Sequence, residues 1–130
     1  MQTPNKRQAI NETKGQRMKK VVVIGIESCP IKRGKFLLIE TEEEIIFSFV
    51  EWSRTHKTGH TMCENFAKQL GFSGEVKGGG WYDVFKTQIC LTAESESYGQ
   101  FDKTIVLTYA DMLGEILEKE VGIDLWQIRV

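Results

Sequence analysis

The 130-residue sequence has few of the residues that would by themselves define a class of protein. It has only two prolines, and its three cysteines are far apart with no Cys-x-x-Cys pair. This cysteine pattern disfavours a disulfide framework or a cysteine-rich zinc site, so we expect half-buried thiols in a reducing compartment. No apolar run approaches the roughly 20 residues that a membrane-spanning helix needs.

An excess of charge of one sign is also lacking, because 17 basic residues face 18 acidic ones and the formal net charge is −1. This balance gives no reason to expect nucleic acid or an anionic membrane as a partner. The amino terminus lacks the apolar core of a secretion signal, and no heptad pattern is present. We therefore expect a cytoplasmic monomer.

The distribution of apolar residues predicts one domain preceded by a tail. Residues 1–18 have almost no large apolar side chains, so they cannot bury enough surface to offset their ordering entropy and are expected to be flexible. The chain as a whole is 41% hydrophobic, which is enough for a core. We place the folded domain at residues 19–130.

Alternation and apolar spacing predict the order β-β-β-α-β-β-α-β, which is typical of an α/β (α+β) domain with a mixed sheet of about six strands and two main helices. The expected strands and extended segments are 19–26, 35–40, 43–52, 74–84, 86–94 and 123–130. The segment "SCPIKRG" before the second strand predicts a turn punctuated by Pro30 and Gly34. In the second helix, expected within 108–122, a stripe of core-facing residues is formed by Met112, Leu113, Ile116 and Leu117.

The first helix is expected from about residue 58 to residue 70, followed by Gly71, but its start is left open by two candidate caps. Thr61 and Glu64 have the spacing of a capping box. If Thr55 is the cap instead, His56 lies in the first turn.

His56 and His60 are the only two histidines, and they lie four residues apart at this helix start. One interpretation is a pair of surface histidines. A second is a general base beside a helix amino terminus that attracts an anion, with Arg54 and Lys57 adding positive charge. A third is a metal site completed by Cys63, which we do not expect because no Glu follows His56 in an H-E-x-x-H pattern.

Two further segments have the composition of a ligand-binding backbone. The triplet Gly78–Gly80 allows positive φ or close approach to a ligand, although a loose turn between strands would have the same composition. The segment "ESESYG" at 94–99 could present N–H groups to an oxyanion. In that case Glu94 and Glu96 should point outward.

In this order, these segments resemble the phosphohistidine phosphatases, also called the Janus/Ocnus family. The segment "GKFLLIE" resembles the family's early strand with its functional lysine, and "VEWSRTHK" resembles the segment that leads to the catalytic histidine. The 22 positions from His56 to Gly78 match the family spacing without a gap, and "ESESYG" resembles its small-residue loop. The resemblance covers about residues 20–100.

The resemblance implies an enzyme without metal or cofactor that hydrolyses the P–N bond of a phosphorylated protein or peptide. His56 would be the general base that activates water. Lys35 would bind phosphate oxygens, with Lys20 as the alternative lysine. The other implied substrate-binding residues are Lys57, Ser95, Ser97, Tyr98 and Gly99.

Two positions depart from the family pattern. Trp81 and Ser48 stand where family members have arginine, and Arg54 and Lys77 are candidates to supply the missing charge. These departures favour, as the alternative, a non-catalytic module that binds phosphate or a phosphorylated or acidic peptide in the same place.

Overall fold

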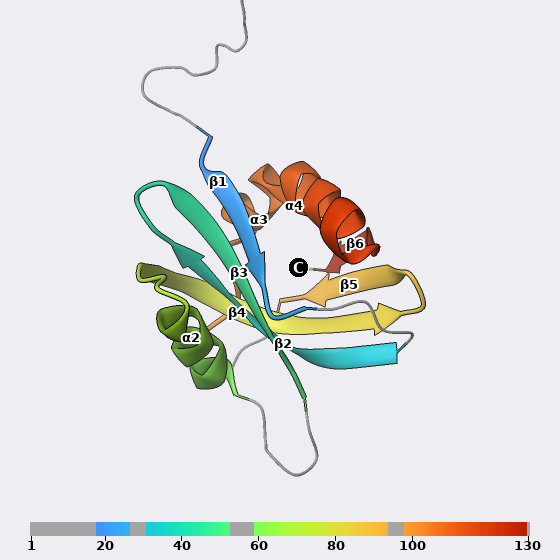
Figure 1. Ribbon diagram of the computed structural model, residues 1–130, viewed down its shortest axis with the longest axis horizontal. Helices are drawn as coiled ribbons and strands as arrows, with labels where there is room; N and C mark the ends of the chain where they lie inside the picture. Colours follow the sequence, from blue (N-terminus) through green and yellow to red (C-terminus); the bar gives the residue numbers. More distant parts are fainter. Residues whose placement is uncertain (1–17, 27–30, 53–58, 94–97, 130) are drawn as a thin grey trace, which may run out of the picture.

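The computed structural model describes residues 18–26, 31–52, 59–93 and 98–129 (Figure 1). Its elements in chain order are β1 (Lys20–Ile24), β2 (Ile31–Glu40), β3 (Glu44–Glu51), α2 (His60–Gln69), β4 (Glu75–Phe85), β5 (Gln88–Thr92), α3 (Lys103–Thr108), α4 (Ala110–Ile116), the π-helical turn η2 (Leu117–Val121) and β6 (Asp124–Arg129). Over these described ranges there is a single mixed sheet of six strands, with α2 and α4 as the longer α-helices, which confirms the predicted α+β class. None of the described helices is both long and apolar enough to cross a bilayer.

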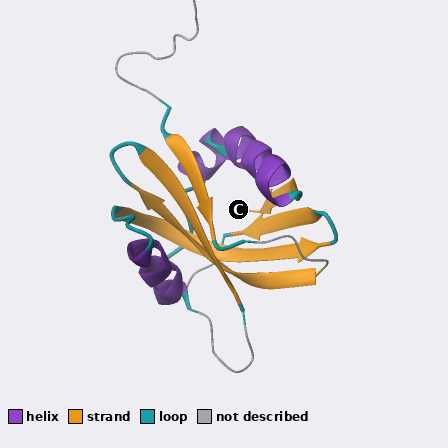
Figure 2. Ribbon diagram, viewed as in Figure 1, coloured by secondary structure: helices purple, strands orange, loops and turns teal. Residues whose placement is uncertain are grey.

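Two antiparallel hairpins form the middle of the sheet (Figure 2). They are β2–β3 and β4–β5, and β2 also pairs with β4 in antiparallel fashion. The outer strands pair in parallel, β1 with β3 and β6 with β5, so the strand order is β1-β3-β2-β4-β5-β6. The sheet is curled, with α2 against one face and α3 and α4 against the other (Figure 1).

Alternate side chains of β2 face two separate cores. Phe36 and Leu38 belong to the larger core, which α3, α4 and η2 help to cover, whereas Leu37 and Ile39 belong to the smaller core under α2. All four are at least 97% buried, and full burial of such a side chain stabilises a fold by about 1.5–3 kcal/mol. Because side chains alternate along a strand, Lys35 lies on the α2 face with Leu37.

The prediction of a turn around Gly34 is wrong, because β2 already begins at Ile31 and includes Gly34. Gly34 pairs with Glu51 of β3 on one side and with Tyr82 of β4 on the other. A Cβ at position 34 would lie 2.2 Å from the carbonyl oxygen of Val50. Glycine is therefore required here by close packing between strands. Pro30 lies outside the described residues.

The predicted first helix is confirmed, but the prediction that Thr61 caps it through a capping box is wrong. The N-cap of α2 is Gly59, without a side-chain cap, and Thr61 is already helical. Thr55, the alternative cap, lies outside the described residues. The chain leaves α2 through Gly71, whose φ of +91° suits glycine.

The second helix begins earlier than predicted. Asp102 caps α3 by accepting a hydrogen bond from the backbone N–H of Ile105 at 3.1 Å, and the chain then continues through α4 and η2. The predicted core stripe on this helix is confirmed. Leu113 and Leu117 are fully buried, and the partly buried members are Met112 and Ile116.

Candidate functional site

A row of paired residues crosses the four central strands at the edge of the candidate site. Val50 of β3 pairs with Lys35 of β2, Lys35 pairs with Trp81 of β4, and Trp81 pairs with Thr92 of β5. Soon after this row, β3 leads to residues 53–58 and β5 leads to residues 94–97. The predicted residues His56, Lys57, Ser95 and Ser97 fall in those two segments and lie outside the described residues, as does Arg54.

The amino-terminal half of α2 is fastened over Lys35 by two buried contacts. The Cys63 thiol donates to the carbonyl oxygen of Lys35 at 3.4 Å, and the Ser48 hydroxyl donates to the carbonyl oxygen of Cys63 at 2.7 Å. Ser48 is fully buried. This position, where the resembled family has arginine, therefore serves to attach α2 to β3.

His60, the first residue of α2, is 98% buried against the glycine triplet. Its Nε2 lies 3.0 Å from the carbonyl oxygen of Gly80. Because a carbonyl oxygen can only accept, Nε2 carries the proton in this contact. A Cβ at position 79 would lie 2.5 Å from Cδ2 of His60, so the triplet's close approach is to this ring.

The environment of His60 favours its neutral form. Burial lowers the pKa of His60 below its ordinary value, the bond to Gly80 opposes this shift, and the positive charge of Lys35 lowers the pKa further. The same ammonium group acts on Cys63, although burial dominates there and raises the pKa of the thiol to about 12. The charge of Lys35 therefore acts on both titratable side chains at the start of α2.

The glycine triplet is part of β4, not a loose turn. Gly78 has φ of +90°, and Gly79 bonds to the segment that follows residue 97: its N–H donates to the carbonyl oxygen of Gly99, and its carbonyl oxygen accepts from the N–H of Phe101, each at 3.1 Å. Gly99 and Phe101 are therefore held directly beside His60's partner strand.

Tyr98 fastens the same segment to α2. Its hydroxyl donates to Oε1 of Glu64 at 2.8 Å and lies 3.4 Å from Oγ1 of Thr61, and its ring meets that of His60 edge-on with centroids 6.4 Å apart. Thr61 and Glu64, the expected capping pair, thus hold Tyr98. The structure brings Tyr98, Gly99 and the start of α2 together, near the positive charge of Lys35.

The two candidate lysines lie in different parts of the sheet. Lys20 pairs with Glu44, six positions along β3 from the partner of Lys35, which corresponds to about 20 Å of extended chain. Lys20 lies on the edge strand β1, whereas Lys35 lies on the inner strand β2.

Two cations of β2 lie close to the indole ring of Trp81. The Nζ atom of Lys35 lies 4.9 Å from the centre of the indole ring, and the guanidinium carbon of Arg33 lies 5.3 Å from it. Arg33 also pairs through Nε with Oδ1 of Asp83 at 3.2 Å. Sequence reasoning missed Arg33 because it was assigned to a turn. Its alternation with Lys35 along an extended strand was the signal that could have identified it.

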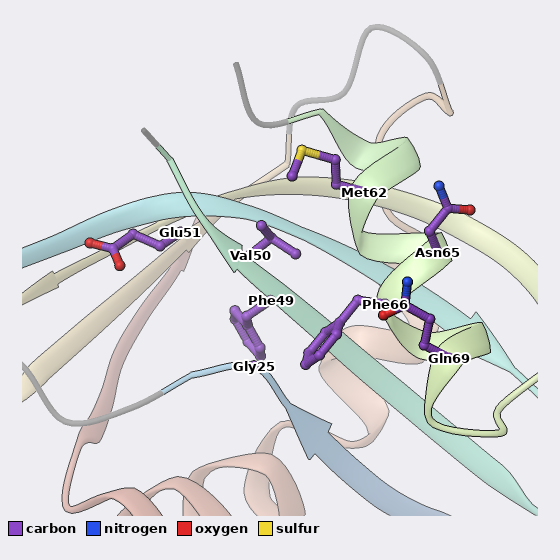
Figure 3. Close-up of a pocket in the computed structure, with 8 residues that line it drawn as sticks. All are labelled: Gly25, Phe49, Val50, Glu51, Met62, Asn65, Phe66 and Gln69. Carbon is purple, nitrogen blue, oxygen red and sulfur yellow. The ribbon is translucent and has the colours of Figure 1, made fainter. Parts of the chain in front are cut away.

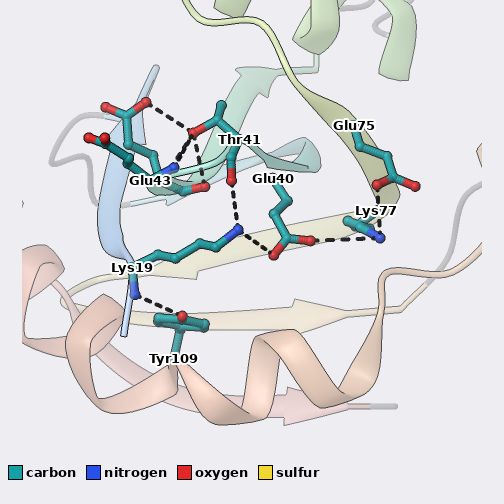
Figure 4. A network of polar contacts seen from close by, with 8 residues as sticks. Lys19, Glu40, Thr41, Glu43, Glu75, Lys77 and Tyr109 are labelled. Atoms are coloured by element: carbon teal, nitrogen blue, oxygen red, sulfur yellow. Dashed lines mark hydrogen bonds and ion pairs between the residues drawn. The ribbon is translucent and has the colours of Figure 1, made fainter. Parts of the chain in front are cut away.

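Lys77, the second candidate for the missing charge, lies within the described residues and belongs to a separate network (Figure 4). It pairs with Glu75 at 3.2 Å and with Glu40 at 3.7 Å, and Glu40 also pairs with Lys19 at 2.8 Å. The contact with Glu75 raises the pKa of Lys77. This network lies at the carboxyl end of β2, five residues along the strand from Lys35, so Lys77 does not add charge to the candidate site.

The described residues contain no group of three His, Cys, Asp or Glu side chains that could hold a metal ion. His60 and Cys63 are instead committed to the carbonyl oxygens of Gly80 and Lys35. Cys90 is partly buried in β5, on the other side of Trp81 from Lys35 along the strand order.

A surface hollow of about 520 Å³ lies on the other side of α2 (Figure 3). It is formed between α2, the end of β3 and Gly25, with Met62 and Phe66 on the helix side. Among the described residues that line the hollow, the charged one is Glu51. The described walls are largely apolar, and Val50, which pairs with Lys35, is among the residues that form them.

No protein-family model matches the chain, and no curated protein matches it.

Proposed function

We propose that the chain is a metal-independent phosphatase that acts on the P–N bond of phosphohistidine, with the phosphoryl group bound between Lys35, the start of α2 and the segment 95–99. The observation that carries the proposal is the convergence on Lys35. Its charge acts on His60 and Cys63 of α2, and Tyr98 and Gly99 are fastened beside that helix. The described residues that follow the segments with His56 and the loop serines are Gly59, the N-cap of α2, and Tyr98, which bonds to Glu64 of α2.

Each group would have a defined part in the reaction. The Lys35 ammonium would neutralise charge on the phosphoryl oxygens, and backbone N–H groups at residue 57 and in the loop would bind the same oxygens. His56 would take a proton from water as the water oxygen attacks phosphorus. The P–N bond would break with its electron pair going to the substrate nitrogen, the proton that His56 accepted would pass to that nitrogen, and inorganic phosphate would be released. Such proton transfer typically contributes 10²–10⁴-fold.

His60 has a different part in this proposal. Its ring is buried and its Nε2 is bonded to Gly80, so it supports the wall of the site and is not the base. The two histidines of the chain therefore provide a matched pair for mutagenesis.

The experiment compares wild type, His56→Ala and His60→Asn in a phosphohistidine-peptide hydrolysis assay, with urea unfolding of each. We expect His56→Ala to lose at least 10²-fold in kcat and to keep wild-type stability, whereas His60→Asn should lose stability. Full activity of His56→Ala would refute the mechanism.

A non-catalytic phosphate-binding module is the second candidate, and a specific observation favours it. Ser48 is fully buried and bonded to α2, so no charged side chain stands at that position. If this candidate is correct, wild type binds the phosphopeptide without turnover, and Lys35→Gln weakens binding.

A further inference from the structure

Arg33 and Lys35 present two cations on one face of β2, both close to the indole ring of Trp81. They are separated by one residue on an extended strand, so their backbones are about 6.6 Å apart. Both cations lie near the ring of Trp81, at 5.3 and 4.9 Å from its centre. These contacts place the two charges no more than about 10 Å apart, which is the sum of the two distances.

Arg33 is equipped to bind a second carboxylate. Its side chain is 65% exposed, and among the described residues Asp83 is the carboxylate within ion-pair distance of it, through Nε. A guanidinium has five N–H donors in a planar fork, so a contact at Nε leaves the donors on the two Nη atoms for another carboxylate. The indole limits the directions in which the long side chain can turn.

We propose that Arg33 and Trp81 form a specificity subsite that binds an acidic side chain two residues from the phosphorylated residue of the substrate. The inference rests on the proposed binding of the phosphoryl group at Lys35. In an extended peptide, side chains two positions apart lie on the same side and about 6.6 Å apart. This spacing equals that of Lys35 and Arg33, so a peptide running along β2 would place its phosphoryl group at Lys35 and its carboxylate at Arg33.

The subsite also accounts for Trp81 in a charged surrounding. An arginine at position 81 would add a third positive charge close to Arg33 and Lys35, and like charges repel. The indole instead attracts both cations and holds them for two separate anionic groups.

The test uses two phosphohistidine peptides that differ only in Glu or Gln at both positions two residues from the phosphohistidine. Kd and kcat/KM are measured for wild type, Arg33→Gln, Arg33→Glu and Lys119→Gln. Lys119 is the matched control, since it is an exposed lysine on η2 that pairs with Glu115. We expect wild type and Lys119→Gln to prefer the Glu peptide by about fivefold, the upper range for an exposed ion pair. Arg33→Gln should remove the preference, and Arg33→Glu should reverse it.

The outcomes separate this inference from the proposed function. Charge-dependent Kd values without hydrolysis support the subsite and refute catalysis. Hydrolysis of both peptides at equal rates, or an unchanged preference in Arg33→Glu, overturns the subsite and leaves the phosphatase proposal in place. If wild type binds neither peptide, both are wrong.

Discussion

Replacing Gly79 with alanine tests whether the buried His60 ring is what requires a glycine inside β4. The new Cβ would lie 2.5 Å from Cδ2 of His60 and 2.7 Å from the carbonyl oxygen of Phe36. Neither distance is compatible with van der Waals contact. The imidazole must move, which breaks its bond to Gly80, or β4 must separate from β2.

The magnitude follows from two contributions. Overpacking of a well-packed site costs about 1–3 kcal/mol, and the lost His60 hydrogen bond costs about 0.5–1.5 kcal/mol. Together they predict a loss of about 2–4 kcal/mol, which is a large part of the roughly 5–15 kcal/mol that stabilises a typical domain. For a chain of this size the melting temperature should fall by about 8–16 °C.

Urea unfolding followed by tryptophan fluorescence measures the effect, and Gly114→Ala is the matched control. A Cβ on Gly114 in α4 would meet Leu125 at 3.6 Å, which is ordinary contact. Because alanine favours a helix interior, this control should be about 0.5–1 kcal/mol more stable than wild type. A Gly79→Ala protein within about 0.5 kcal/mol of wild type would show that the ring does not need the glycine, and the account of the triplet would be wrong.

Three further predictions concern side chains of the same region. The pKa of His60 is lowered, so its neutral ring stabilises the fold. The free energy of unfolding should be at its full value above about pH 6.5 and should fall as the pH drops through the folded pKa. Urea midpoints measured between pH 8 and pH 5 should show a smaller loss for His60→Asn than for wild type. Cys63, whose pKa is raised to about 12, should remain unmodified by iodoacetamide at pH 8 until urea unfolds the chain, as peptide mass mapping would show. Tyr98→Phe removes the bond to Glu64 and should lower the free energy of unfolding by about 1 kcal/mol, whereas no change would mean that this contact is dispensable.

The sheet was predictable because its strands are encoded locally. The β-branched run before Gly25 and the alternation around Phe47 and Leu91 place β1, β3 and β5 within two residues of their observed bounds. Helix α2 was predictable for the same reason, since its apolar spacing is a local property.

The errors arose where one residue type serves two physical purposes. Gly34 is typical of a turn, but here it permits close strand packing, and only the partner strand reveals this. The start of α3 depends on the Asp102 cap, and the residues 104–106 that follow it are β-branched, so the sequence does not distinguish a helix from a strand there. The role of His60 depends on its contact with Gly80 of β4, which is 20 residues further along the chain, so no local sequence pattern reveals it.

The candidate site itself was predictable only in part. The assignment of Lys35 to a strand holds, and the structure adds its place under α2. Arg33 was not identified, because the turn assigned to its segment concealed the alternation with Lys35. His56 and the serines of the loop lie outside the described residues and stay predictions.

The row that joins Val50, Lys35, Trp81 and Thr92 has a consequence for folding. Lys35 and Trp81 belong to different hairpins, and each hairpin is joined by a short turn that can close quickly. Their meeting across β2 and β4 requires strands that are distant in the chain to find each other, which is the slower kind of event. A nascent chain that has released only the first hairpin therefore carries the lysine without its aromatic neighbour, and the pair of Lys35 and Trp81 forms only when the two halves of the sheet have joined.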